Sequence, residues 1–175
     1  MMNRTAMQPE SVEHPLAPVW NEASRVLILG TMPSPKSREQ GFYYAHPQNR
    51  FWKVLASLFE QPLPNGTEER RRFALQHQIA LWDVLASCEI SGAADQSIRN
   101  PVPNPIENLL GNSNLRAVFT TGATAFRLYQ KLCLPRTGIS AIALPSTSPA
   151  NCRVNLEQLC EAYQVILPYL QDEPH

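Results

Sequence analysis

A polar and aromatic cluster marks the most distinctive segment of the chain. The stretch HPQNRFW, residues 46–52, places an imidazole, a carboxamide and two aromatic rings just before an apolar helical pattern. The amide of Asn49 can accept hydrogen bonds through its oxygen and donate them through its nitrogen, so it could position a water molecule without being a strong base. Asn49 also stands where asparagine often caps a helix, here one beginning at Arg50. Both roles can hold together, because a cap fixes the side chain.

Two further segments carry hydroxyls in stiff, proline-bearing turns. GTMPSP, residues 30–35, begins with a glycine that allows close backbone approach. It lacks the ending of a phosphate-binding P-loop and the later glycines of a dinucleotide fingerprint. LPSTSPAN, residues 144–151, holds three hydroxyls between two prolines, and such groups can donate to a phosphate backbone. Taken alone, either segment could be an ordinary turn.

The elements that must position these segments alternate along the chain. Short apolar runs predict strands at 25–30, 115–122 and 139–146, and either a strand or a strand followed by a loop at 79–88. Capping residues and apolar spacing predict helices at about 50–59, 67–77, 105–110, 123–132 and 155–170. This order predicts an α/β fold, with a parallel sheet covered by helices on both faces. Because ligand crevices lie beyond the carboxyl ends of such strands, the loops after Leu29, Phe119 and Leu144 should meet at one site.

Length and charge set further bounds. The chain has 175 residues, 43% of them hydrophobic, which suits one domain with a real core. We expect residues 1–22 to form a flexible N-terminal arm and 23–175 a single domain. Fifteen basic and fifteen acidic residues cancel, so any binding of nucleic acid must depend on a local patch. No segment has the apolar length of a membrane span or the pattern of a signal peptide, so we expect a cytoplasmic protein.

The cysteines show no spacing typical of a metal site. They are expected to be small apolar residues in a reducing compartment. The four are Cys88, Cys133, Cys152 and Cys160. The sequence therefore predicts no metal and no cofactor, and we expect a monomer.

Five segments, in this order, resemble the uracil-DNA glycosylase superfamily and most closely its hypoxanthine (deoxyinosine)-DNA glycosylase branch: GTMPSP, GFYYAHPQNRFW, LWDVL, VFTTG and LPSTSPAN. They lie within about residues 25–152, and the long second segment is the specific one. The resemblance implies a three-layer α/β/α sandwich with a central four-stranded parallel sheet. It also implies an enzyme that flips a deaminated base (hypoxanthine, with uracil or xanthine as alternatives) out of DNA and hydrolyses its N-glycosidic bond, leaving an abasic site. The iron-sulfur cluster of some branches is not expected, because the cysteines lack a close pair.

The resemblance also suggests which residues form the site. Many superfamily members place water with an acidic or amide residue two positions after the first glycine, but Met32 stands there and cannot do so. The hypoxanthine branch moves this catalytic role to Asn49. The expected base-binding residues are Gly30, Thr31, Met32, Tyr43, Phe51 and Thr121. The expected DNA-binding residues are Ser34, His46, Ser146, Thr147, Ser148 and Asn151.

Three residues leave open questions. The branch often has asparagine where Thr121 stands, and threonine offers one hydroxyl on a shorter arm, so the base preference is open. Asp83 lies in an apolar strand pattern, where we expect it to tie down neighbouring amides. His46 could contact a phosphate, although a histidine beside a proline is more typical of a hydrogen-bonded structural residue.

Two other kinds of function stay open at this stage. One is a non-enzymatic domain that binds nucleotides or nucleic acid, and the other is a hydrolase of free nucleosides. Convergence of the basic residues near the motifs on one face would favour DNA, and their scatter would favour a small substrate. These residues are Lys36, Arg38, Arg50, Lys53 and Arg153.

Overall fold

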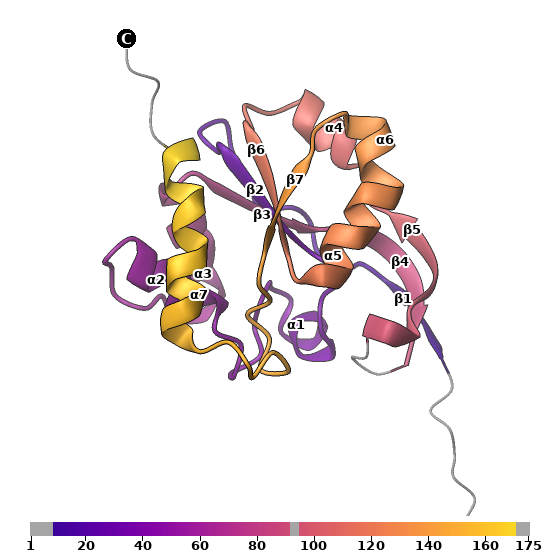
Figure 1. Cartoon of the computed structure of the whole chain (residues 1–175), viewed down its shortest axis with the longest axis horizontal. Coiled ribbons are helices and arrows are strands. Elements are labelled where there is room, and N and C mark those ends of the chain that lie inside the picture. The colour runs from indigo at the N-terminus through magenta and orange to yellow at the C-terminus, as the bar shows by residue number, and fades with distance from the viewer. Residues whose placement is uncertain (1–8, 92–94, 171–175) are drawn as a thin grey trace, which may run out of the picture.

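The computed structural model describes residues 9–91 and 95–170, and a four-stranded parallel sheet forms their centre (Figure 1). The strand order is β3-β2-β6-β7, and every neighbouring pair is parallel. The strands are β2 (Val26–Gly30), β3 (Ile79–Asp83), β6 (Ala117–Thr121) and β7 (Ala141–Leu144). This arrangement confirms the α/β fold with a central four-stranded parallel sheet that the motifs implied.

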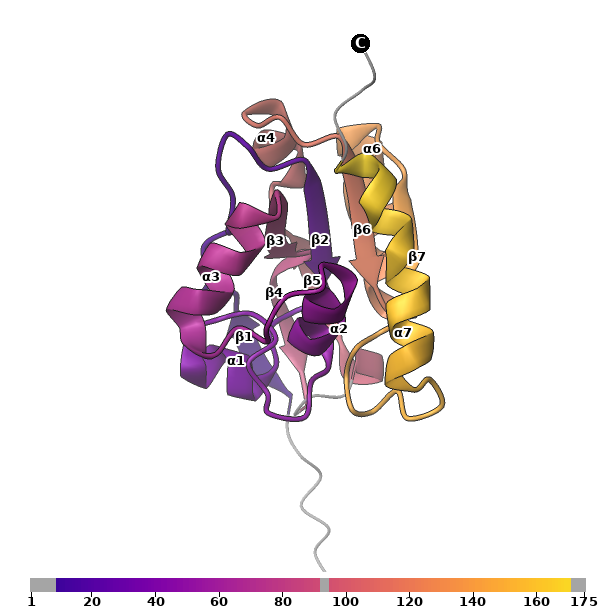
Figure 2. The same cartoon turned by 90° about the vertical axis from the view of Figure 1, so that its left-hand side faces the viewer.

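Helices cover both faces of the sheet, as Figures 1 and 2 show. One face carries α2 (Phe51–Leu58), α3 (Gly66–Gln76) and α7 (Leu156–Tyr163). The other carries α4 (Ile106–Gly111), α5 (Ala123–Leu128) and α6 (Leu134–Thr137), with the π-helical turn Tyr129–Cys133 joining α5 to α6. The short helix α1 (Pro35–Gln40) lies at the end of the sheet, and a 3-10 helix, Gln164–Tyr169, follows α7. No described helix has both the length and the apolar character of a membrane span.

The core lies on both sides of the central strands. All five residues of β2 and all five of β3 are buried, as expected for strands covered by helices on both faces. Trp52 and Phe51 of α2 pack with Phe42 and Phe73 into an aromatic cluster. The indole nitrogen of Trp52 donates to the Tyr43 carbonyl at 3.2 Å, so the cluster also fixes the segment that precedes α2.

The N-terminal segment is part of the fold. A second, antiparallel sheet has the order β1-β4-β5 and consists of β1 (Glu10–Glu13), β4 (Leu85–Ile90) and β5 (Arg99–Pro103). Val19 is 1% exposed and pairs with Leu81 through its backbone. The flexible arm predicted for 1–22 is therefore wrong for residues 9–22, because backbone pairing compensates for their polar composition; residues 1–8 lie outside the described part.

The segment 79–88 does not form one strand. It leaves the central sheet after Asp83 and enters the second sheet at Leu85, because the amides of Val84 and Leu85 donate to the carbonyls of Gly30 and Thr31. The Asn104 side chain secures the switch by donating to the carbonyls of Asp83 and Leu85, at 2.9 and 3.0 Å. The turn keeps Asp83 at the end of β3, level with Gly30.

Candidate active site

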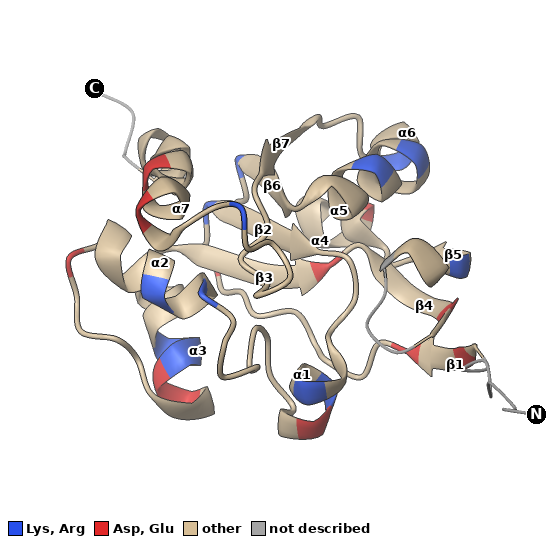
Figure 3. Ribbon diagram, turned by 60° about the horizontal axis from the view of Figure 1, so that its bottom comes forward, with Lys and Arg blue, Asp and Glu red and all other residues tan. Residues whose placement is uncertain are grey.

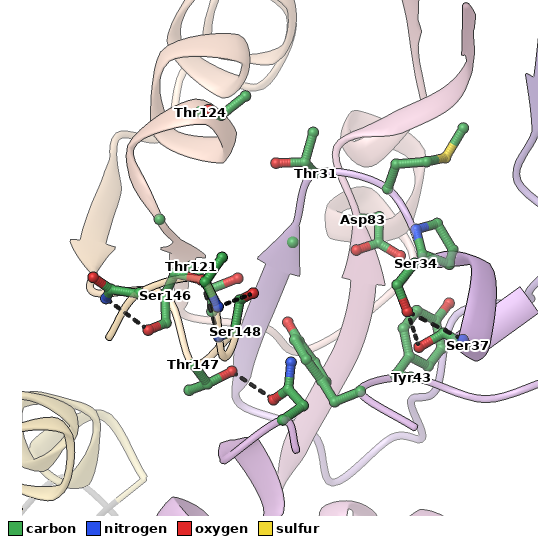
Figure 4. A pocket seen from close by; sticks show the side chains of 18 of the residues that line it. Thr31, Ser34, Ser37, Tyr43, Asp83, Thr121, Thr124, Ser146, Thr147 and Ser148 are labelled. Atoms are coloured by element: carbon green, nitrogen blue, oxygen red, sulfur yellow. Dashed lines mark hydrogen bonds between the residues drawn. The ribbon is translucent and has the colours of Figure 1, made fainter. Parts of the chain in front are cut away.

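All four parallel strands end at one cavity of about 980 Å³ (Figure 4). The final residue of each strand lines it: Gly30, Asp83, Thr121 and Leu144. The three proline-, glycine- and hydroxyl-bearing loops contribute most of the remaining wall. The prediction that these loops meet beyond the carboxyl ends of the strands is confirmed.

The first loop lies close against the end of β3. A Cβ atom on Gly30 would come within 2.6 Å of the Asp83 Oδ1 atom, so only glycine leaves that oxygen accessible. Thr31, Met32 and Ser34 also line the cavity. The Ser34 hydroxyl caps α1, because it accepts from the Ser37 amide at 3.1 Å.

Asn49 lines the cavity and also holds the start of α2. Its Oδ1 atom accepts from the Phe51 amide at 2.9 Å and from the Thr147 hydroxyl at 2.8 Å. Its Nδ2 atom has no partner among the described residues. The helix-capping interpretation thus agrees with the structure, although the formal cap position is Arg50.

Tyr44 is the ring that reaches the cavity beside Asn49. It stacks on Phe51 with ring centroids 3.8 Å apart and an angle of 13° between the planes. Phe51 is fully buried and does not line the cavity, contrary to the expectation that it contacts the base directly. Tyr43 does line it, and its hydroxyl donates to the Ala17 carbonyl at 2.8 Å.

The backbone of Tyr44 adopts an unusual conformation, with φ at 53°. Left-handed backbone is uncommon for a bulky residue, and such strain often occurs at functional sites. Burial and, to a smaller extent, the Asp83 carboxylate raise the pKa of the Tyr44 hydroxyl above its ordinary value, so it stays protonated at neutral pH. The sequence offered three rings on which a flipped base could stack, Tyr43, Tyr44 and Phe51, but assigned only Tyr43 and Phe51 to base binding.

Asp83 pairs with a residue of the N-terminal segment. Its Oδ2 atom lies 2.7 Å from the His14 Nε2 atom, and the two side chains are 6% and 2% exposed. The Oδ1 atom has no partner among the described residues. Asp83 is the only acidic residue among those described as lining the cavity. The sequence predicted that Asp83 accepts hydrogen bonds from neighbouring amides, but in the structure its side chain lines the cavity (Figure 4).

Arg50 holds the third loop, residues 144–151, through hydrogen bonds to backbone carbonyls. Its guanidinium donates to the carbonyls of Ser148, Asn151 and Val154, so this cation is used within the protein. Thr147 is 1% exposed, which places its hydroxyl beyond the reach of a phosphate. Asn151 donates to the Ser146 carbonyl at 3.0 Å.

Two serines of this loop keep their hydroxyl protons available. The Ser146 oxygen accepts from the Ser148 amide at 3.1 Å, and the Ser148 oxygen accepts from the Ala150 amide at 3.2 Å. No described residue accepts from either hydroxyl. Both serines line the cavity beside Thr121, opposite Asp83 and Ser34 (Figure 4).

His46 lies outside this constellation. It does not line the cavity, and its Nδ1 atom accepts from the Gln48 amide at 3.1 Å. This bond matches the structural role that the sequence favoured for a histidine beside a proline.

Comparison with known proteins places the chain in a family. The model of the uracil DNA glycosylase superfamily matches residues 17–171. The chain belongs to this superfamily. It is accordingly a DNA glycosylase, an enzyme that hydrolyses the bond between a base and its deoxyribose, and the reading as a non-enzymatic binding domain is set aside.

Two curated relatives and one solved structure share most of the chain. The chain is 33% identical over 138 residues to a protein of Methanosarcina barkeri named hypoxanthine DNA glycosylase, covering 78% of this chain and 86% of that one. A protein of the same name from Methanosarcina acetivorans is 32% identical over 137 residues, covering 77% and 85%. A solution structure from M. acetivorans, described as a candidate uracil DNA glycosylase, matches with a TM-score of 0.77 and 26% identity over 90% of this chain and 98% of that one.

Some Lys and Arg residues of this glycosylase lie near the cavity, and others lie away from it on α3, α6 and β5 (Figure 3). Figure 3 shows Lys and Arg positions on α1, on α2 and on the loop before α7, at the end of the molecule where the loops meet. Arg38 of α1 lines the cavity itself. Lys36 lies 3.6 Å from Glu39, an exposed pair that contributes little to stability. Arg38 at the cavity suits a phosphate-bearing partner, whereas Arg50 is already bonded within the protein.

The described residues hold no cluster of three or more His, Cys, Asp or Glu side chains that could bind a metal ion. No disulfide joins the four cysteines, all of which lie in the described part of the chain. Burial raises the pKa of the Cys133 thiol to about 11, so this side chain behaves as a small apolar core residue.

Proposed function

We propose that this DNA glycosylase excises deaminated bases, hypoxanthine above all, with uracil and xanthine as further substrates, and leaves an abasic site. One observation carries the proposal: the cavity holds an unpaired acceptor, Asp83 Oδ1, and an unpaired donor, Asn49 Nδ2, beside the ring of Tyr44. The names of the two Methanosarcina relatives support hypoxanthine as the base.

Deamination changes the hydrogen-bonding pattern of a base in the direction that suits this cavity. Adenine and cytosine present a bare ring nitrogen on their pairing edge, whereas hypoxanthine and uracil present a ring N–H at the same place. A carboxylate only accepts hydrogen bonds, so Asp83 complements the N–H and repels the bare nitrogen. A flipped base also needs a ring to stack on, which Tyr44 offers.

The reaction itself needs no strong base. As the N-glycosidic bond breaks, positive charge develops on the sugar and negative charge on the departing base. A water molecule can attack the cationic sugar without prior deprotonation. The protein must instead bind the base, stabilise its negative charge and bind the phosphates on either side of the flipped nucleotide.

The direct test uses oligonucleotides that differ in a single base. Single- and double-stranded DNA bearing hypoxanthine, uracil or xanthine is incubated with the purified chain, and alkali then cleaves at any abasic site. We expect strand cleavage at hypoxanthine and none at adenine in the same position. Free deoxyinosine serves as a parallel substrate, since efficient hydrolysis of it would favour a nucleoside hydrolase. Intact strands with all three damaged bases would refute the proposal.

The hydroxyls of Ser146 and Ser148 are expected to grip the DNA backbone. Replacing each with alanine removes a donor worth about 0.5–1.5 kcal/mol, so affinity for DNA should fall roughly 2- to 10-fold per residue. The rate at saturating enzyme should change far less. Titration of labelled DNA at fixed salt measures the affinity, and Ser57→Ala on the exposed surface of α2 is the matched control. Unchanged affinity in both variants would remove this role.

Thr121 is expected to contribute to the choice of base. It ends β6 and lines the cavity, and the branch often has asparagine there. Thr121→Asn adds an amide arm, and a matched amide contributes about 1–3 kcal/mol of discrimination between bases. The ratio of single-turnover rates on hypoxanthine and uracil should therefore shift. Thr121→Val, which has the same shape without the hydroxyl, separates the new arm from loss of the old one. An identical ratio in all three proteins would show that position 121 does not read the base.

A further inference from the structure

The orientation of the Asn49 amide is fixed by its neighbours. The Phe51 backbone amide can only donate, so the Asn49 atom 2.9 Å away must be the oxygen. The Thr147 hydroxyl, 2.8 Å from the same oxygen, supplies a second donor. Two donors fill the usual capacity of an amide oxygen, and turning the amide over would place its NH₂ group against the Phe51 N–H, which cannot accept a hydrogen bond.

Thr147 cannot easily move away from this bond. It is 1% exposed, and its carbonyl accepts from the Arg50 amide at 3.1 Å. The Arg50 guanidinium holds the following turn through carbonyls of Ser148, Asn151 and Val154. A loop 98 residues away in the sequence thus sets the side chain of Asn49, and the dashed line at Thr147 in Figure 4 marks this hydrogen bond.

We infer that Thr147 is a positioning residue that fixes Asn49 as a hydrogen-bond donor, so that Asn49 stabilises the departing base rather than accepting a hydrogen bond from water. The inference rests on the proposed function and specifies how its central residue acts. The only polar atom that Asn49 has left for the substrate is Nδ2, which carries two N–H groups.

The bonds and charges balance with this assignment. The C1′–N bond of the nucleotide breaks and its electron pair leaves with the base. The hydrogen bond that the Asn49 Nδ2 atom donates to the base strengthens as negative charge develops there. The water oxygen bonds to C1′, and one water proton ends on the base while the other stays on the new hydroxyl. No group of the protein has to become a strong base.

Asn49→Asp distinguishes a donor from an acceptor. One carboxylate oxygen can accept from both Phe51 and Thr147, so the local fold is kept, and the other oxygen then faces the cavity as an acceptor. A donor role predicts a fall in single-turnover rate of at least about 100-fold. A water-accepting role predicts a rate near that of the wild type or above it.

Thr147 is tested with two substitutions of graded chemistry. Thr147→Val keeps the shape and removes the hydroxyl, which should slow single-turnover cleavage at saturating enzyme roughly 5- to 10-fold. Thr147→Ser keeps the hydroxyl and should remain within about twofold of the wild type, an expectation from the same hydrogen bond. Affinity for DNA should stay unchanged in both, since this hydroxyl is buried. Rescue by serine would not follow from a merely structural role, because serine loses the methyl that packs.

A second measurement does not depend on turnover. The Asn49 side-chain NH₂ signals, assigned by comparison with Asn49→Ala, should shift when free hypoxanthine is titrated into ¹⁵N-labelled wild-type protein. Failure of wild type to cleave any damaged oligonucleotide would refute the proposed function and this inference with it. If the wild type is active, any one of three results would overturn the inference alone. They are an Asn49→Asp variant of comparable rate, a Thr147→Ser variant as slow as Thr147→Val, and Asn49 NH₂ signals that do not move at saturating hypoxanthine.

Discussion

Asn49→Ala is expected to slow single-turnover cleavage of a hypoxanthine oligonucleotide by about 10²- to 10³-fold. The substitution removes the N–H groups that face the cavity, and the alanine side chain has no polar atom to replace them. Met32 has no donor, and Asp83 offers only acceptor atoms. Affinity for undamaged DNA should change little, because the serines that we expect to bind the phosphates belong to another loop. Rates measured with enzyme in excess separate the chemical step from binding and product release.

The same substitution should also lower stability. It leaves the Phe51 amide and the buried Thr147 hydroxyl without their acceptor, and a stranded buried donor costs about 1–3 kcal/mol. Thermal unfolding shows whether the variant is folded at the assay temperature. Asn114→Ala, at an exposed asparagine whose amide bonds to the Glu22 carbonyl, makes the same chemical change away from the cavity. A folded Asn49→Ala protein within tenfold of the wild-type rate would show that Asn49 is not catalytic.

The central sheet followed from local patterns in the sequence, because strands buried on both faces are short apolar runs that end in glycine or polar residues. The entry of residues 85–90 into a second sheet did not, because the sequence left open only whether 79–88 is one strand or a strand followed by a loop. The direction of this entry depends on the carbonyls of Gly30 and Thr31, about fifty residues earlier. The strand β1 was missed for a related reason, since a run with one buried apolar residue, Val12, gains its stability from pairing with β4.

The site shows the same division. The motif placed Asn49 at the cavity, but sequence alone could not say which ring beside it faces the ligand. Tyr44 reaches the cavity and covers Phe51 because its backbone turns into the left-handed region. Asp83 became a candidate only through its place in the cavity beside Gly30 and through its pairing with His14, which is 69 residues away and lies in the segment expected to be an arm. Pairings of this kind leave no periodic signal along the chain.

Substitution of Asp83 is expected to have the second large effect on the cleavage rate, because this side chain is proposed to read the base. His14 holds one carboxylate oxygen, and the absence of a side chain on Gly30 leaves the other accessible from the cavity. Hydrogen bonds to charged groups are worth about 1.5–3 kcal/mol. Asp83→Ala is therefore expected to slow cleavage of hypoxanthine DNA roughly 10- to 150-fold. Part of any loss could come from the unpaired His14, so alanine alone does not separate recognition from support of the fold.

Asp83→Asn makes that separation. The amide oxygen can keep the bond with His14, and the Nδ2 donor then faces the cavity in place of Oδ1. A donor opposes the N1–H of hypoxanthine but suits the bare N1 of adenine. The single-turnover rate on hypoxanthine divided by that on adenine should therefore fall roughly 5- to 150-fold, which corresponds to about 1–3 kcal/mol of discrimination. Glu157→Gln, at an exposed position in the first turn of α7, is the matched change of carboxylate to amide. The oligonucleotides differ only at the one base, and long incubations set an upper limit on the slow rate of adenine cleavage. If the rates on both bases fall by the same factor, Asp83 supports the fold of the cavity without reading the base. Loss of packing alone would slow cleavage of both purines alike, because they have nearly the same shape.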